Sequence, residues 1–378
     1  MLLGKEIYHN VFHPEMDIYK DHLYINDRFF PIGYFAMEAL NITDESLSLL
    51  DRYASAIKTV SISFLPGARK GFRNKLALIL PELRENVTNF VRTLCELPPF
   101  RSWNVEKEIE KVNEYFGDGA LKKVLCLGLD GAFFFQYIDV TTSAPTAIRD
   151  FRTAGRFLEE KYLRDLPRRD EPNFATATYK CFHSDEFYEI ALAQGMDMEA
   201  FSLSPSLRSH CSFAHNPDDE SQLIFLDTIA FDSYMDFFVY DLLNGMHHGH
   251  APSKCQNCGR YYLTTDARKP KYCYRKAIQN PNYTCRQYGA INHQKEKNAN
   301  HPVFQIYKTR TSTIRKHHQR GKISDEVRKE ALKICEELRD NALLDNDFAR
   351  GNYLRLMEQD AIYAEVDKRL GGCGSHDK

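Results

Sequence analysis

Long hydrophobic runs are missing from this sequence. The longest, LALIL and AFFFQYI, fall far short of the roughly 18 apolar residues that a membrane-spanning helix needs. The opening residues MLLGKEIYHN become charged after four positions, so they lack the roughly 7–15-residue apolar core of a secretory signal peptide. These absences predict a cytoplasmic protein without membrane association, in a compartment where cysteine thiols stay reduced.

Internal repeats and low-complexity tracts are also absent, so nothing in the sequence indicates a repeat architecture. With 378 residues, 43% of them hydrophobic and 27% charged, the chain has the composition of an ordinary globular protein of two or three domains. We predict an α+β fold that is mainly helical. An acidic N-terminal domain with small β-hairpins is expected over residues 1–250, and a four-cysteine module packed with C-terminal helices over residues 251–378.

Two turn-prone residue pairs predict hairpins in the N-terminal domain. Asn26-Asp27 separates apolar residues in DHLYINDRFFPIGYF, and Asp130-Gly131 does so in VLCLGLDGAFFFQYIDV. The segment MHHGHAPSK, at the end of this domain, is expected to be a polar, mobile linker. Its three histidines are weaker candidates for metal ligands: His247, His248 and His250.

Apolar residues that recur every three or four positions predict several helices. In SDEVRKEALKICEELRDNAL, Ser324 is placed as the N-cap, and Cys335 lies on the apolar stripe, which indicates a core position. The remaining helices are expected in NVEKEIEKVNEYFGDG, TAIRDFRTAGRFLEEKYL, DTIAFDSYMDFFVYDLLNG, HPVFQIYKTRTSTIRKHHQRGK and NYLRLMEQDAIYAEVDKRL.

Acidic residues are almost missing from residues 254–322. This segment has 16 Lys or Arg residues but only Asp266 and Glu296 as acids, a net charge of +14, whereas residues 1–253 carry −12. Such asymmetry indicates a module that binds a polyanion, or one that docks on an acidic surface of its own chain or of a partner.

Four cysteines lie in this basic segment with the spacing C-x2-C-x14-C-x11-C. A C-x2-C pair on a tight turn directs two thiolates at one ion, and a second pair completes a tetrahedral shell that suits zinc. Four thiolates leave no open coordination position, so we predict a structural zinc and not a catalytic one. A disulfide is disfavoured in the cytosol, and no thioredoxin-like setting surrounds the C-x2-C pair. The predicted ligands are Cys255, Cys258, Cys273 and Cys285.

The motifs CQNCGRYYL, ARKPKYC and TCRQYG, followed by YKTRTSTIRKH, resemble the C-terminal module of an uncharacterised bacterial family, a domain of unknown function. In that family an acidic, mainly helical part precedes a four-cysteine zinc module, and no activity is established. The same cysteine motifs are more distantly similar to the zinc fingers of bacterial regulators named for a Cys-Gly-Asn-Arg motif, although this chain has CRQYG at the fourth cysteine. Both resemblances imply zinc ligation by the four cysteines.

A helix with basic faces is predicted in HPVFQIYKTRTSTIRKHHQRGK, where Arg and Lys suit phosphate contacts that give affinity without reading sequence. Three tyrosines near the cysteines (Tyr261, Tyr262 and Tyr272) are expected to cover them, with stacking on bases as the alternative. The residues predicted to contact nucleic acid or another polyanion are Lys308, Arg310, Arg315, Lys316 and Arg320.

Catalytic motifs are not apparent. The segment GARKGFRNK lacks the order of a phosphate-binding Walker loop, and Cys211 would need His210 or His215 beside it in space to act as a nucleophile. The sequence therefore favours a zinc-stabilised protein that binds DNA or RNA, regulatory or linked to mobile DNA. The alternatives are an adaptor whose basic module docks an acidic protein, and an enzyme whose N-terminal site leaves no motif.

Overall fold

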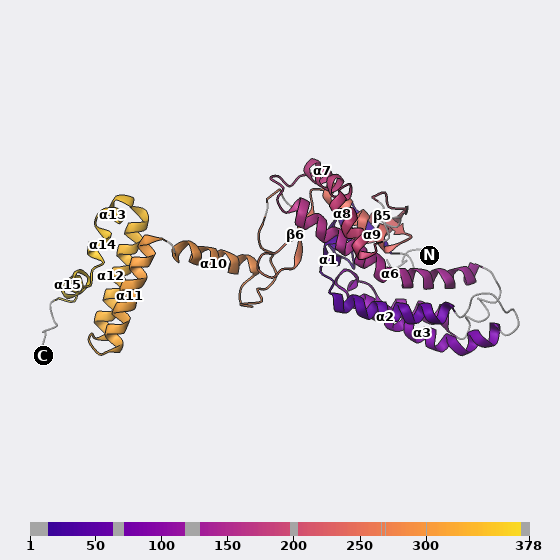
Figure 1. Ribbon diagram of the computed structural model, residues 1–378, viewed down its shortest axis with the longest axis horizontal. Coiled ribbons are helices and arrows are strands. Elements are labelled where there is room, and N and C mark those ends of the chain that lie inside the picture. Colours follow the sequence, from indigo (N-terminus) through magenta and orange to yellow (C-terminus); the bar gives the residue numbers. More distant parts are fainter. Residues whose placement is uncertain are drawn as a thin grey trace. The chain divides into compact units, whose positions relative to one another are not determined.

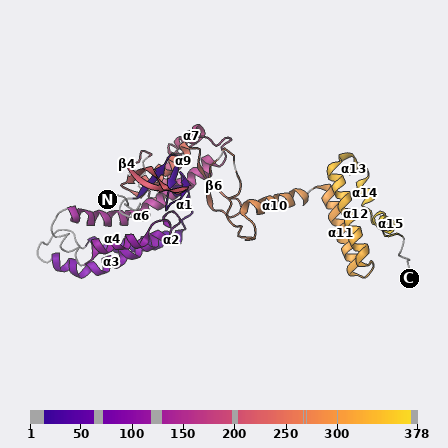
Figure 2. The ribbon, with the colours of Figure 1, turned by 180° about the vertical axis from the view of Figure 1, so that it is seen from behind.

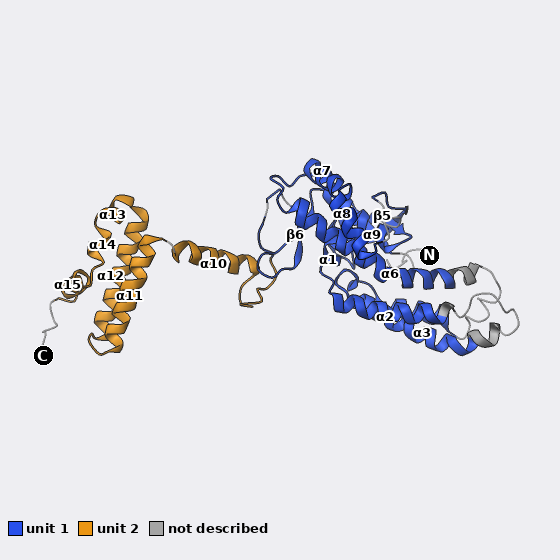
Figure 3. Ribbon diagram, in the orientation of Figure 1, with its two compact units in different colours: residues 1–273 blue, residues 274–378 orange. Residues whose placement is uncertain are grey.

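The structure is a computed structural model, and it describes residues 14–62, 72–117, 129–196, 203–265, 267–268, 270–299 and 301–371. The chain divides into two compact units, residues 1–273 and residues 274–378 (Figure 3). The domain boundary predicted from composition lies between residues 250 and 251. The first unit extends past that point and takes in the two short strands beyond it.

The first unit is mainly helical (Figure 1). Helix α2 packs against α3 and α6 (Figure 1). Helix α3 also packs against α4 (Figure 2). The helices described in this unit are α1 (Tyr34–Ala39), α2 (Asp44–Ile62), α3 (Phe72–Glu96), α4 (Val105–Phe116), α6 (Leu129–Leu158), α7 (Glu171–Phe182), α8 (Asp185–Gln194) and α9 (Tyr234–His247), with a 3-10 turn η1 (Pro98–Phe100) and a π turn η2 (Glu159–Leu163).

Two antiparallel sheets complete the first unit. The larger has the strand order β3-β2-β1-β5-β4, so β4 is an edge strand, and the smaller pairs β6 with β7. The sequence did not predict the long β4–β5 hairpin. The strands are β1 (Glu15–Tyr19), β2 (His22–Tyr24), β3 (Phe29–Pro31), β4 (Leu207–Asn216), β5 (Asp219–Phe231), β6 (Ala251–Lys254) and β7 (Tyr261–Thr264). The predicted fold class, α+β and mainly helical with small antiparallel sheets, is confirmed.

The hairpin predicted at Asn26-Asp27 is confirmed. These two residues connect β2 to β3, and the flanking Ile25 and Arg28 exchange both backbone hydrogen bonds, at 2.9 and 3.1 Å. Both turn residues have positive φ angles, 46° and 56°. Two consecutive positive φ angles define the type I′ turn that matches the twist of paired strands, and Asn and Asp tolerate them.

The hairpin predicted at Asp130-Gly131 is wrong, because both residues lie inside helix α6. The apolar residues of this run continue at helical spacing, and Phe134, Ile138 and Ile148 are buried in the main core. A helix that buries one long apolar face overrides a local turn preference. The first half of the predicted hairpin, residues 124–128, lies outside the described residues.

The linker predicted at MHHGHAPSK is also wrong. Helix α9 continues through His247, and β6 begins at Ala251. The two histidines after α9 contact backbone carbonyls: Nδ1 of His248 lies 2.9 Å from the Asn244 carbonyl, and Nδ1 of His250 lies 2.9 Å from the carbonyl of Ile32, which is distant in the sequence. Ala230 lies in the segment DTIAFDSYMDFFVYDLLNG that was predicted as this helix, but it pairs within the sheet as part of β5.

A buried carboxylate joins α9 to the start of α1. Oδ1 and Oδ2 of Asp241 accept hydrogen bonds from the backbone N–H groups of Gly33 and Ala36, each at 2.8 Å. Burial raises the pKa of Asp241 to about 6, against the opposing effect of these backbone hydrogen bonds. Asp241 therefore fixes α1 on α9 in the centre of the aromatic core, which includes Phe35 and Phe237 with ring centroids 5.0 Å apart.

The second unit has its own hydrophobic core. Ser324 caps the helix predicted from it, with its side chain accepting from Val327 N–H, and Cys335 is buried in that core as expected. The single last helix that was predicted is divided at Met357. The helices of this unit are α10 (Cys285–Ala299), α11 (Pro302–Gln319), α12 (Asp325–Leu344), α13 (Asn346–Gly351), α14 (Tyr353–Leu356) and α15 (Gln359–Arg369).

Across the described ranges of both units, no helix has the length and the apolar content that crossing a bilayer would demand.

Candidate metal centre

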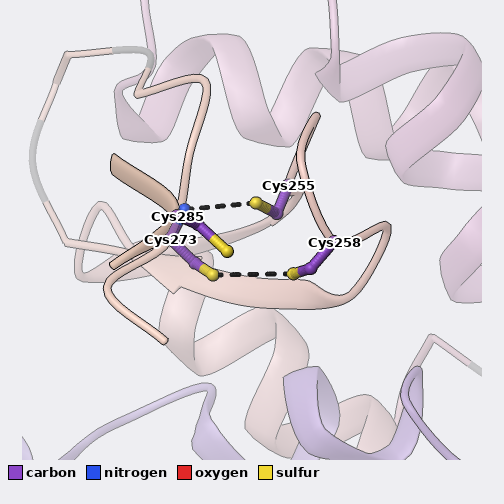
Figure 4. Close-up of side chains that lie close together, drawn as sticks. All are labelled: Cys255, Cys258, Cys273 and Cys285. Carbon is purple, nitrogen blue, oxygen red and sulfur yellow. Dashed lines mark hydrogen bonds between the residues drawn. The ribbon is translucent and has the colours of Figure 1, made fainter. Parts of the chain in front are cut away.

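The four cysteines predicted as ligands lie together in space (Figure 4). All four sulfur atoms are within 4.8 Å of one another. The Sγ atoms of Cys258 and Cys273 are 3.7 Å apart, which is too long for a disulfide bond of about 2 Å. Sulfurs bound at about 2.3 Å around one tetrahedral ion would be about 3.8 Å apart. The arrangement therefore fits a single metal ion with four thiolate ligands.

The first two cysteines are positioned by a tight loop between β6 and β7. Cys255 directly follows β6, and its backbone N–H donates to the Arg260 carbonyl at 2.9 Å, while Gly259 N–H donates to the Cys255 carbonyl at 2.9 Å. Gly259 has a φ of 71°, a left-handed conformation that glycine adopts without steric cost. The loop therefore turns the chain back so that Cys258 faces Cys255, as expected for a C-x2-C metal-binding turn.

The other two cysteines come from the segment after β7. Gln256 N–H donates to the Lys271 carbonyl at 2.9 Å, which places the approach to Cys273 beside the first loop. Cys285 opens helix α10, and its N–H donates to the Arg275 carbonyl at 2.8 Å. The longer gap between the third and fourth cysteines is thus closed by backbone hydrogen bonds.

Backbone hydrogen bonds favour the thiolate form of Cys255, whereas burial raises the pKa of Cys258. Cys255, Cys273 and Cys285 are 1%, 2% and 0% exposed, and the N–H of Cys273 lies 3.4 Å from the Cys255 sulfur. Burial raises the pKa of Cys255, but backbone hydrogen bonds from Cys258, Cys273 and Asn257 outweigh it and lower the pKa to about 7. Thiolate is the form that ligates metals, and four ligands would leave no position for a substrate.

The β6–β7 hairpin is attached to the helices of its own unit by buried and half-buried ionic groups. Lys254 donates through its N–H to Glu159 Oε1 at 3.2 Å and through Nζ to Glu160 Oε1 at 2.6 Å. The Arg169 guanidinium donates to the Pro252 carbonyl at 3.1 Å and to Thr264 Oγ1 at 3.2 Å. These contacts attach the hairpin that carries Cys255 and Cys258 to η2 and to the segment that precedes α7.

Two of the tyrosines near the cysteines belong to this framework. Tyr261 is 3% exposed, and its backbone N–H and carbonyl bond the Asn41 side chain at 2.8 and 3.0 Å. The Tyr262 hydroxyl donates to the Pro270 carbonyl. Tyr272 is half-buried. The two strand tyrosines are therefore held within the framework of the hairpin, and the covering of the cysteines by them stays a prediction.

The five basic residues predicted to contact a polyanion all lie on helix α11 or at its end. Arg310 is half-buried, and its Nε donates to the Met357 carbonyl, so it also holds the junction of α14 and α15. The other four side chains are exposed, and within the described part of the chain none of them forms an ion pair: Lys308, Arg315, Lys316 and Arg320.

The catalytic alternatives gain no support from the described residues. Cys211 is exposed on β4, and its sulfur lies 4.0 Å from Asp227 Oδ1. Its neighbour His210 points to the opposite face of the strand, as alternation requires.

Comparisons with known proteins show one similarity. No curated protein and no solved structure matches the chain, and the distant similarity to zinc-finger regulators is not found. The part of the chain that contains the four cysteines and all the helices of the second unit, residues 202–369, matches the family described as "Family of unknown function (DUF6076)".

Proposed function

We propose that this protein binds nucleic acid through a zinc-stabilised module formed by residues 251–322. Zinc is the ion that best suits four thiolates in a closed tetrahedral site. Such a site supplies folding energy and leaves no open position for catalysis. The module would then act by presenting a surface, and the character of its surface residues decides what it binds.

The observation that carries this proposal is the row of unpaired cations on α11. Lys308, Arg315, Lys316 and Arg320 are exposed along one helix, and the structure pairs none of them with an acid among the described residues. Ser312 is exposed on the same face as Lys308 and Arg315. Cations and hydroxyl groups in this arrangement suit phosphate oxygens, which carry most of the affinity for nucleic acids.

Several acids of the second unit pair with cations of α12 and α15. Arg369 of α15 pairs with Glu330 and Glu337 of α12 at 3.2 and 2.9 Å. Asp325 at the start of α12 pairs with Arg328 and Lys329, and it lies 3.6 Å from Nε2 of His318 on α11. These acids leave the four exposed cations of α11 and its end, Lys308, Arg315, Lys316 and Arg320, without an acidic partner among the described residues.

The direct test is a binding titration of the zinc-loaded protein against labelled duplex and single-stranded DNA and RNA near physiological salt. Binding to at least one of these is expected. No detectable binding to any of them would contradict the proposal and would favour the adaptor, in which the same cations dock an acidic protein surface. Capture of an acidic protein that is lost on neutralising Arg315 and Lys316 would then support that alternative.

A further inference from the structure

The segment between the third and fourth cysteines presents large apolar side chains to solvent. Tyr274 is 72% exposed, Ile278 is 68% exposed and Tyr283 is 40% exposed. Single exposed apolar residues are common on protein surfaces, but three within ten positions of one short loop are not. Neither the covering of the cysteines nor the phosphate contacts of α11 explain them.

Backbone hydrogen bonds hold this loop in a fixed shape. Lys276 and Thr284 form a β-bridge, Ala277 N–H donates to the Tyr283 carbonyl at 2.9 Å, and Tyr283 N–H donates to the Asn280 carbonyl at 3.1 Å. Ala277 is 1% exposed and anchors the loop from inside. The exposed rings therefore project from a closed, preorganised turn, which reduces the entropy lost when they bind a ligand.

The surroundings of these rings are positively charged. The Arg286 guanidinium carbon lies 5.2 Å from the centroid of the Tyr274 ring, and the same guanidinium donates to the Tyr274 hydroxyl. Lys276, on the bridge, is exposed. No acidic residue occurs between Asp266 and Glu296. A ligand for this loop must therefore offer both negative charge and flat apolar faces.

We propose that Tyr274 and Tyr283 stack on unpaired bases while Lys276 and Arg286 contact the adjacent phosphates, so that the preferred ligand is single-stranded nucleic acid. This inference rests on the proposed function and specifies its ligand. In a regular duplex the base faces are hidden in the stack, whereas a single strand exposes every face to an aromatic side chain. Ile278 adds a third exposed apolar side chain to the same loop.

The test compares strands that differ only in their bases. An oligonucleotide of about 20 nucleotides exceeds the site size of most such proteins. The zinc-loaded, full-length protein is titrated with this strand as DNA and as RNA, with the DNA duplex, with an abasic strand of the same length, and with heparin. Tighter binding to single strands than to the duplex and to the abasic strand is expected. Equal affinity for the abasic strand and the normal strand would overturn the inference, even without any variant.

Variants then test which side chains account for the preference for single strands. Tyr274→Leu and Tyr283→Leu keep an apolar side chain but remove the ring, and each is expected to weaken single-strand binding roughly five- to a hundredfold, as removal of a stacking ring does in other proteins. Binding of heparin should stay unchanged. The matched control is Tyr188→Leu, because Tyr188 on α8 is 56% exposed and lies far from the loop in the sequence. Unchanged single-strand affinity in both loop variants would overturn the inference.

These outcomes separate the two proposals. Equal affinity for the duplex, for single strands and for heparin would support phosphate contacts by α11 and would contradict base stacking by the loop. Absence of any nucleic-acid binding would contradict both proposals. The comparison of DNA with RNA strands decides which sugar the site accepts.

Discussion

Gly245 of α9 lies backbone to backbone against Gly33 at the start of α1. A methyl group at position 245 would lie 2.9 Å from the Cα atom of Gly33 and 3.1 Å from the carbonyl oxygen of Ile32. Neither atom can move aside as a flexible side chain would. We therefore expect Gly245→Ala to force α1 away from α9 and to lower the free energy of unfolding by about 1–3 kcal/mol, as overpacking does.

Chemical denaturation measures this effect, with Gly351→Ala as the matched control. A methyl group at Gly351, at the end of α13, would have nothing within 4 Å. It is expected to leave stability unchanged or to raise it by less than about 1 kcal/mol, because alanine favours a helix over glycine. Equal stability of Gly245→Ala and the unmodified protein would show that the two helices are not held at this distance.

The buried carboxyl group of Asp241 predicts a pH dependence. Its pKa is raised by burial from 3.8 to about 6. Between these values the folded protein keeps a proton that the unfolded chain has released, so the free energy of unfolding falls as the pH rises from about 4 to about 6. The fall amounts to about 3 kcal/mol for a shift of this size.

Asp241→Asn isolates this effect, because asparagine does not titrate and has nearly the same volume. The free energy of unfolding of both proteins is measured with denaturant at several pH values from about 4 to about 7. Subtracting the value for the variant from that for the unmodified protein removes the contributions of the titrating groups that the two proteins share. The stability of the unmodified protein relative to the variant should fall across this range. A relative stability that rises with pH would mean that the N–H groups of Gly33 and Ala36 dominate over burial.

The cysteine cluster predicts a metal content. Elemental analysis of the purified protein should find about one zinc per chain, and Cys258→Ser should lose it, since a hydroxyl replaces one of four thiolates. Chelation should also increase amide hydrogen exchange around Cys255 and Cys273, because metal binding and local folding are coupled. Cys211→Ser, which changes an exposed cysteine of β4, should keep the full metal content. A folded protein without stoichiometric metal would contradict the assignment.

The cations of α11 predict a salt dependence. Replacing both Arg315 and Lys316 with alanine should weaken binding similarly for all nucleic-acid sequences. The double variant should also flatten the slope of log affinity against log salt by about 1–2, close to one for each phosphate that is no longer neutralised. Arg350→Ala with Arg355→Ala removes the same charge from exposed positions outside α11 and should leave the slope unchanged. Equal slopes in both double variants would exclude α11 as the contact surface.

The cluster of four cysteines and one hairpin could be predicted because their signals are local. The C-x2-C spacing states the ligand type directly, and Asn26-Asp27 meets a φ requirement that few residues meet. The same kind of signal failed at Asp130-Gly131, where the burial of a long helical face decides the structure. Strand β4 was missed because its sequence, LRSHCSFAHN, lacks a regular apolar alternation and pairs with β5 over its whole length.

Other features depend on contacts that sequence spacing does not reveal. The partners of Asp241, Gly33 and Ala36, are 208 and 205 residues away along the chain. The tyrosines near the first cysteines were expected to cover them, with stacking on bases as the alternative, and the structure shows Tyr261 buried and Tyr274 exposed. Tyrosine is found in both settings, and only the fold decides between them.

The π turn η2, Glu159–Leu163, has a consequence for how this chain can change over evolution. Its backbone bond, from Arg164 N–H to the Glu159 carbonyl, encloses one residue more than an α-helical turn does. A π turn takes up one extra residue while the residues on either side of it keep their directions. Deleting one residue there would leave an ordinary α-helical turn and would keep Glu160 and Arg169 on the β6–β7 hairpin. In an alignment of relatives, a one-position gap at the π turn is therefore expected to leave both of these partners of the hairpin in place.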